Sequence, residues 1–134
     1  MTAKVTYLGS LRTQCEHQQS GASFVTDAPK DNQGKGEAFS PTDTVATALA
    51  SCMLTIIGIK ARDNGWDVEG ATAEVSKEMA ADPRRISRIG ISIRFPLNFD
   101  EKTRTILERA ARTCPVMYSL NPDIEVALDF SYPS

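Results

Sequence analysis

One segment constrains the fold of this chain more than any other: DTVATALASCMLTIIGIKAR, from Asp43 to Arg62. Its side chains are almost all apolar or small, and no charged residue follows Asp43 until Lys60. A surface helix of a soluble protein has one apolar and one polar face, whereas a helix that is apolar all round is buried. The segment therefore predicts a central helix that other parts of the protein must cover on every side.

Local signals mark both ends of this helix. Ser40 is suited to cap the free amides, Pro41 has a φ angle suited to the first helical position, and Asp43 can close a capping box. At the other end, Asn64 and Gly65 form a stop signal. The helix is therefore expected to run from Pro41 to about Asn64.

On this helix the side chains form two stripes. One is apolar and consists of Val45, Ala48, Leu49, Cys52, Ile56 and Ile59. The other is built mostly from small side chains, which allow close approach of another helix or sheet, and consists of Thr44, Thr47, Ser51, Thr55, Gly58 and Arg62.

The remaining sequence predicts strands and a second helix. Alternating apolar residues and turn signals place the elements as follows: a strand over 4–17, a turn over 18–21, a returning strand over 22–26, a long loop over 27–39, strands over 67–79 and 87–97, a helix from a capping box at 98–101 to Thr113, a helical turn over 116–120, and a last strand over 123–132. This order predicts a single α+β domain over residues 1–134 with a largely antiparallel sheet. Because one sheet covers only one side of the central helix, we expect a homodimer in which the small-residue stripes meet.

Composition excludes several classes of function. A net charge of −2 and a pI near 5.4 argue against a nucleic-acid-binding protein, which needs a basic patch. The N-terminus lacks a signal-peptide pattern, and the apolar run is shorter than the ~20 residues of a membrane span, so a cytoplasmic protein is expected. No C-x-x-C occurs and His17 is the only histidine, so neither a metal site nor a cofactor is expected.

Two of the three cysteines fall on helices. Cys52 lies in the middle of the central helix, where a free cysteine often serves as a small core residue. Cys114 ends the second helix on its apolar side, just before Pro115. If the two helices pack together, the thiols become neighbours, and a sulfenic acid on Cys52 would condense with Cys114 to a disulfide. Core packing and redox chemistry are both consistent with this pattern.

Two segments carry a resemblance to a known family. FSPTDTVATALASCMLTI, followed later by CPVMYSLNPDIEVALDF, resembles the OsmC/Ohr family of thiol-dependent peroxidases, and TDAPKDNQGKGE and KEMAADPRRI are similar to a less characterised branch of it. The resemblance implies an intertwined homodimer with two central buried helices and active sites at the subunit interface. It also implies a stress-response enzyme that reduces organic hydroperoxides with a peroxidatic cysteine, Cys52, and a resolving cysteine, Cys114. A dithiol reductant, such as a lipoylated or thioredoxin-like protein, would regenerate the thiols.

The family also uses an N-terminal arginine held by a glutamate. Arg12 is the only arginine in the N-terminal third and is the candidate, since a buried thiol without a nearby cation stays protonated and unreactive. The usual glutamate position, ten residues before the cysteine, is Thr42 in this chain, and Glu37 and Asp43 are the available substitutes. Asp43 is also expected to cap its helix.

The sequence also offers a further candidate residue and an alternative function. His17 shares a strand with Cys15 and is a candidate supporting residue, although a polar residue at a hairpin end is the commoner situation. A non-catalytic module that senses oxidation or binds an apolar ligand on the same fold is the alternative function. A carboxylate that holds Arg12 favours the peroxidase, and the lack of such a carboxylate favours the non-catalytic module.

Overall fold

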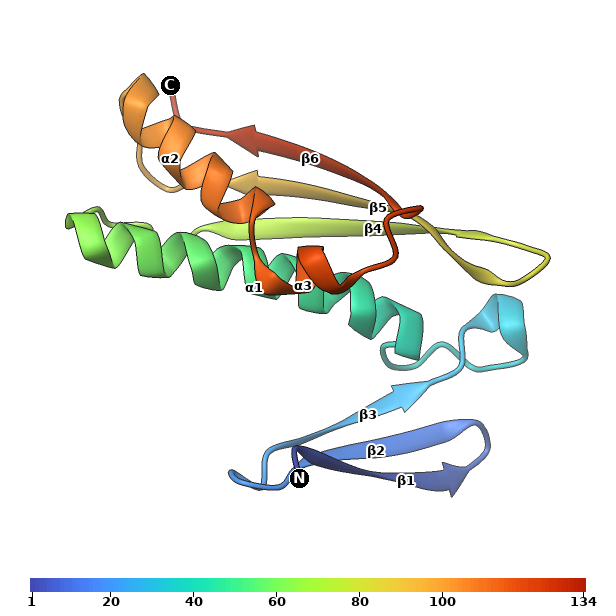
Figure 1. Ribbon diagram of the computed structural model, residues 1–134. Coiled ribbons are helices and arrows are strands. Elements are labelled where there is room, and N and C mark those ends of the chain that lie inside the picture. Colours follow the sequence, from blue (N-terminus) through green and yellow to red (C-terminus); the bar gives the residue numbers. More distant parts are fainter. The chain divides into compact units, whose positions relative to one another are not determined.

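A computed structural model describes residues 1–134, and the chain forms two compact units, Met1–Val45 and Ala46–Ser134. The expected α+β class is confirmed, with two three-stranded sheets and the helices that accompany them. In chain order the elements are β1 (Ala3–Gly9), β2 (Arg12–His17), β3 (Ser23–Asp27), the 3-10 helix η1 (Lys30–Asn32), α1 (Pro41–Asn64), β4 (Thr72–Ala80), β5 (Arg85–Arg94), α2 (Glu101–Arg112), α3 (Pro115–Ser119) and β6 (Glu125–Ser131) (Figure 1).

The first unit contains the antiparallel sheet β1-β2-β3. The hairpin predicted around residues 18–21 is confirmed as the β2–β3 connection. The single strand expected over 4–17 is wrong, because the chain reverses at Ser10 and Leu11, whose φ angles are 55° and 64°. A leucine in the left-handed region is uncommon, so its identity gives no turn signal, and the alternating pattern runs on through the reversal.

The long loop after β3 is confirmed and is closed on itself. The Asp27 N–H donates to the Phe39 carbonyl at 3.0 Å, and the Gly36 N–H donates to the Ala28 carbonyl at 3.1 Å. Gly34 is required here, because a Cβ at that position would collide with the Ala28 carbonyl. The loop therefore has a defined path that returns its far end to the end of β3.

The predicted limits of α1 are confirmed. The Ser40 N–H donates to Asp43 Oδ2 at 3.0 Å and the Asp43 N–H donates to Ser40 Oγ at 3.1 Å, which is the reciprocal capping box. Gly65 follows the helix with a φ of 72°. Helix α1 is long and apolar enough to cross a membrane, a property that core helices of soluble proteins share.

The second unit contains the sheet β4-β5-β6, with β5 antiparallel to β4 and parallel to β6. Ile89, Ile91 and Ile93 of β5 are buried, whereas the residues between them are more accessible. These isoleucines form one buried cluster with residues of α1 and α2, so both helices pack on the same face of the sheet (Figure 1).

The buried face of α1 differs from the predicted apolar stripe. Leu49 is buried as expected, but Val45 and Ile59 are exposed. A helix that is apolar all round offers several equally apolar stripes, and packing selects among them. The buried side consists of Ala46, Leu49, Ala50, Met53, Ile57 and Ala61.

Two element starts in this unit also differ from prediction. Strand β4 begins at Thr72 rather than at residue 67, because the residues before it form a loop in which Asp67 Oδ1 accepts the Glu69 N–H at 2.9 Å. The cap of α2 is Asp100 rather than Asn98, and its Oδ1 accepts the Thr103 N–H at 2.8 Å.

Candidate functional site

The two helix cysteines lie beside one another in the second unit. Cys52 projects from the middle of α1 and is half-buried, whereas Cys114 precedes α3 and is fully buried. Pro115 begins α3, and the Cys114 sulfur accepts the Met117 N–H at 3.4 Å, so this thiol caps the short helix. The local sequence Cys-Pro thus ends α2, turns the chain and directs Cys114 toward α1.

The two thiols differ in their exposure to solvent. Burial, together with the neighbouring Cys52 thiol, raises the pKa of Cys114 above its ordinary value. Cys114 therefore remains protonated at neutral pH and out of contact with solvent. Cys52 is the thiol of the pair that a dissolved oxidant can reach.

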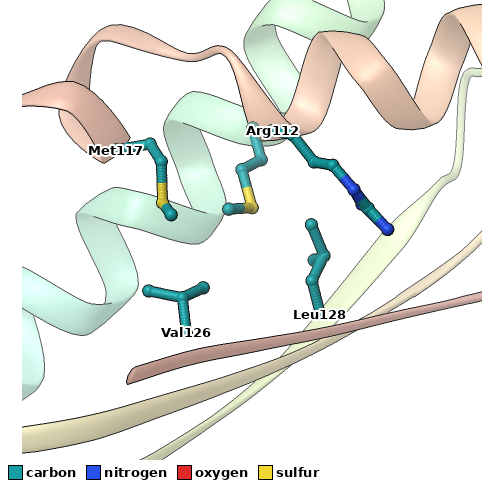
Figure 2. A pocket seen from close by; sticks show the side chains of 5 residues that line it. Arg112, Met117, Val126 and Leu128 are labelled. Carbon is teal, nitrogen blue, oxygen red and sulfur yellow. The ribbon is translucent and has the colours of Figure 1, made fainter. Parts of the chain in front are cut away.

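A pocket of about 350 Å³, lined by four apolar side chains and by Arg112, lies in the same unit, next to segments that carry the cysteines. Met53 follows Cys52 in the chain, and Met117 provides the N–H that Cys114 accepts. Figure 2 shows Met117, Val126 and Leu128 around a common space, with the Arg112 side chain extending along one side of it. The pocket can take an apolar group of modest size.

Arg12 forms a second cluster, within the first unit. It is the first residue of β2, and its Nη2 lies 2.6 Å from Glu37 Oε2 and 3.6 Å from Asp27 Oδ2. Arg12 and Asp27 face each other across the β2–β3 register, and the folded loop brings Glu37 back to them. Glu37, one of the carboxylates that the sequence offers for Arg12, therefore forms an ion pair with it.

The remaining candidate residues make other contacts. Asp43 closes the capping box of α1, and the Thr42 hydroxyl lies 3.3 Å from Ser40 Oγ. His17 Nδ1 lies 2.6 Å from Ser20 Oγ in the β2–β3 turn, at the opposite end of β2 from Arg12.

Sequence reasoning missed Asp27, the one fully buried carboxylate of the Arg12 cluster. Asp27 directly follows the strand predicted over 22–26, and this position is the signal by which the sequence could have singled it out. The lining of the pocket is not visible in the sequence, because Met53, Met117, Val126 and Leu128 come from three separate segments.

Comparison with known proteins supports the same assignment of family. The profile of a family described as OsmC-like protein matches residues 34–129. A Psychrobacter arcticus protein, named for an osmotic stress induced and detoxification response, is 59% identical, with a TM-score of 0.95 over 98% of this chain and 96% of that one. No curated protein matches the chain.

More distant structures share the fold alone. An organic hydroperoxide resistance protein OsmC from Legionella pneumophila has 17% identity and a TM-score of 0.76, over 96% of this chain and 94% of that one. An organic hydroperoxide resistance protein from Elizabethkingia anophelis has 16% identity and a TM-score of 0.77, over 99% and 97% of the two chains. With the family match over most of its length and the 59% identical structure, this chain belongs to the OsmC-like protein family.

Proposed function

We propose that the protein is a thiol-dependent peroxidase that reduces organic hydroperoxides. The observation that carries this proposal is the pair of adjacent cysteines, one half-exposed and one fully buried. The organic hydroperoxide resistance proteins of the same fold support it. No metal or cofactor is required by the chemistry.

The proposed reaction is balanced by the two thiols and one external dithiol. The Cys52 thiolate attacks the distal oxygen of the hydroperoxide, the O–O bond breaks, and the alkoxide takes a proton to leave as the alcohol. Cys52 is then a sulfenic acid, and the Cys114 thiol condenses with it to form the disulfide and water. A dithiol reductant returns both cysteines to thiols by exchange.

Arg12 is proposed to supply the positive charge that the Cys52 thiolate and the peroxide oxygens need. Both ion pairs of Arg12 use Nη2, so Nε and Nη1 keep donors for a further acceptor. Glu37 is proposed to hold the guanidinium in place, the role that a glutamate near the start of the cysteine helix has elsewhere in the family. An arginine fork suits this role because it binds a carboxylate and a second oxygen acceptor at once.

The four apolar side chains of the pocket support a preference for organic hydroperoxides over hydrogen peroxide. Burying an alkyl or aryl group among Met53, Met117, Val126 and Leu128 stabilises the bound substrate by about 0.8 kcal/mol per buried methylene. Hydrogen peroxide has no such group.

Anaerobic stopped-flow mixing of the reduced protein with cumene hydroperoxide and with hydrogen peroxide tests this function. The expected result is faster oxidation by cumene hydroperoxide, followed by a disulfide between Cys52 and Cys114 of one chain, with Cys15 left free on peptide mapping. Recovery of all three thiols unmodified would contradict peroxidase chemistry. It would favour the alternative, a module that binds an apolar ligand in the pocket.

We also expect the protein to be a homodimer. The small-residue stripe of α1 is accessible, and Thr47, Ser51 and Thr55 line an open groove of about 440 Å³ with Ala73 and Val75 of β4. Sedimentation equilibrium at low micromolar concentration should give about twice the 14.6 kDa mass of the chain. A species of the single-chain mass would remove the argument for an interface on this helix.

A further inference from the structure

Asp27 occupies an unusual position for a carboxylate. It is the last residue of β3, and its side chain is 0% exposed, whereas Glu37 is 58% exposed. Its Oδ2 accepts the Glu37 N–H at 2.9 Å and lies 3.6 Å from Arg12 Nη2. One buried oxygen thus contacts both members of the Arg12–Glu37 pair.

The other oxygen of this carboxylate, Oδ1, is buried and has no hydrogen-bond partner. Leaving a buried acceptor unpaired costs free energy, and buried charges are retained where they are paired or where function requires them. An asparagine would keep an oxygen for the Glu37 N–H without placing a negative charge in the interior. The carboxylate is therefore explained by what it does to Arg12 rather than by the hydrogen bond to the loop.

We propose that Asp27 is the positioning residue of Arg12. Its fixed negative charge holds Nη2 from the buried side, and its hydrogen bond to the Glu37 backbone sets where the Glu37 carboxylate lies. Arg12 is 35% exposed, and Glu37 alone, a solvated side chain on a loop, would hold it only weakly. With Asp27 present, the guanidinium is held in one orientation, in which both ion pairs use Nη2. This inference rests on the proposed function, in which Arg12 stabilises the Cys52 thiolate.

Two alternative roles of Asp27 predict opposite changes in the reactivity of Cys52 in the Asp27→Asn variant. If Asp27 only reduced the positive charge of Arg12, Asp27→Asn would make the thiolate more stable and Cys52 more reactive. If Asp27 positions Arg12, the same variant leaves the cation mobile and Cys52 less reactive. Asp27→Asn keeps the size of the side chain and an acceptor for the Glu37 N–H, so the loop contact is retained.

The experiment is a double-mutant cycle between Asp27→Asn and Arg12→Ala. The rate of Cys52 alkylation by iodoacetamide and the rate of oxidation by cumene hydroperoxide are both measured between about pH 6 and pH 9. We expect Asp27→Asn to lower both rates about tenfold at neutral pH, and to have no further effect in the Arg12→Ala background. Glu16→Gln removes an exposed carboxylate from the same strand as Arg12 and is the matched control, with rates unchanged.

The outcomes separate the two proposals. An equal loss in both backgrounds, or a gain in rate, would overturn the positioning role. Alkylation that depends on Asp27 through Arg12, without oxidation by the hydroperoxide, would uphold the positioning role and refute the peroxidase.

If Asp27→Asn does not fold, nuclear magnetic resonance of the Arg12 guanidinium in the Glu37→Gln protein decides the question. Rotation about its C–N bonds should remain restricted there, because Asp27 still holds Nη2. Free rotation would overturn the inference.

Discussion

A Cys52→Ser protein is expected to lose its reaction with cumene hydroperoxide by at least about a thousandfold, the scale seen when a catalytic nucleophile is removed. Cys52 is the accessible thiol of the pair, and the buried Cys114 is held protonated by its raised pKa. A serine hydroxyl has the shape of the thiol without its nucleophilicity toward peroxide oxygen. Anaerobic stopped-flow mixing of each reduced variant with the hydroperoxide measures the effect.

Two further serine variants make this result specific. Cys114→Ser should keep the first oxidation step but form no internal disulfide, so that Cys52 sulfenic acid persists and is trapped by dimedone. Cys15→Ser, at a half-buried strand position, is the matched control and should behave as the parent does. Retention of the reaction in Cys52→Ser together with its loss in Cys114→Ser would reverse the assigned roles.

An Arg12→Ala protein is expected to react with cumene hydroperoxide about 10- to 100-fold more slowly at neutral pH. The reason is the proposed role of Arg12 in stabilising the Cys52 thiolate, and each tenfold loss of rate corresponds to about 1.4 kcal/mol. Stopped-flow mixing at neutral pH measures the effect.

Two lysine comparisons test the geometry of the cation. Arg12→Lys should recover only part of the rate, because an ammonium does not hold a carboxylate and a peroxide oxygen with one planar fork. Lys4→Ala removes a positive charge from β1 of the same sheet and should leave the rate unchanged. With circular dichroism showing folded variants, an Arg12→Ala rate equal to that of the parent would exclude Arg12 from the reaction.

Part of the candidate site could be identified from the sequence, and part could not. Cys52 and Cys114 stand out because a thiol on each of two apolar helix faces is visible in the residue pattern. Arg12 stands out because no other arginine occurs near the N-terminus. The carboxylates beside it do not stand out in this way. Asp27 and Glu37 are 15 and 25 residues away in the chain, and the hydrogen bonds of the folded loop bring them to the same guanidinium.

The limits of α1 follow from local residues alone. Ser40, Asp43 and Gly65 act within one turn of the backbone that they cap, so their effect does not depend on the rest of the fold. The buried side of that helix depends on packing, since an all-apolar helix has no preferred face until it packs against β5 and α2. The reversal at Leu11 also depends on tertiary contacts, because the pairing of β1 with β2 outweighs the local cost of a left-handed leucine.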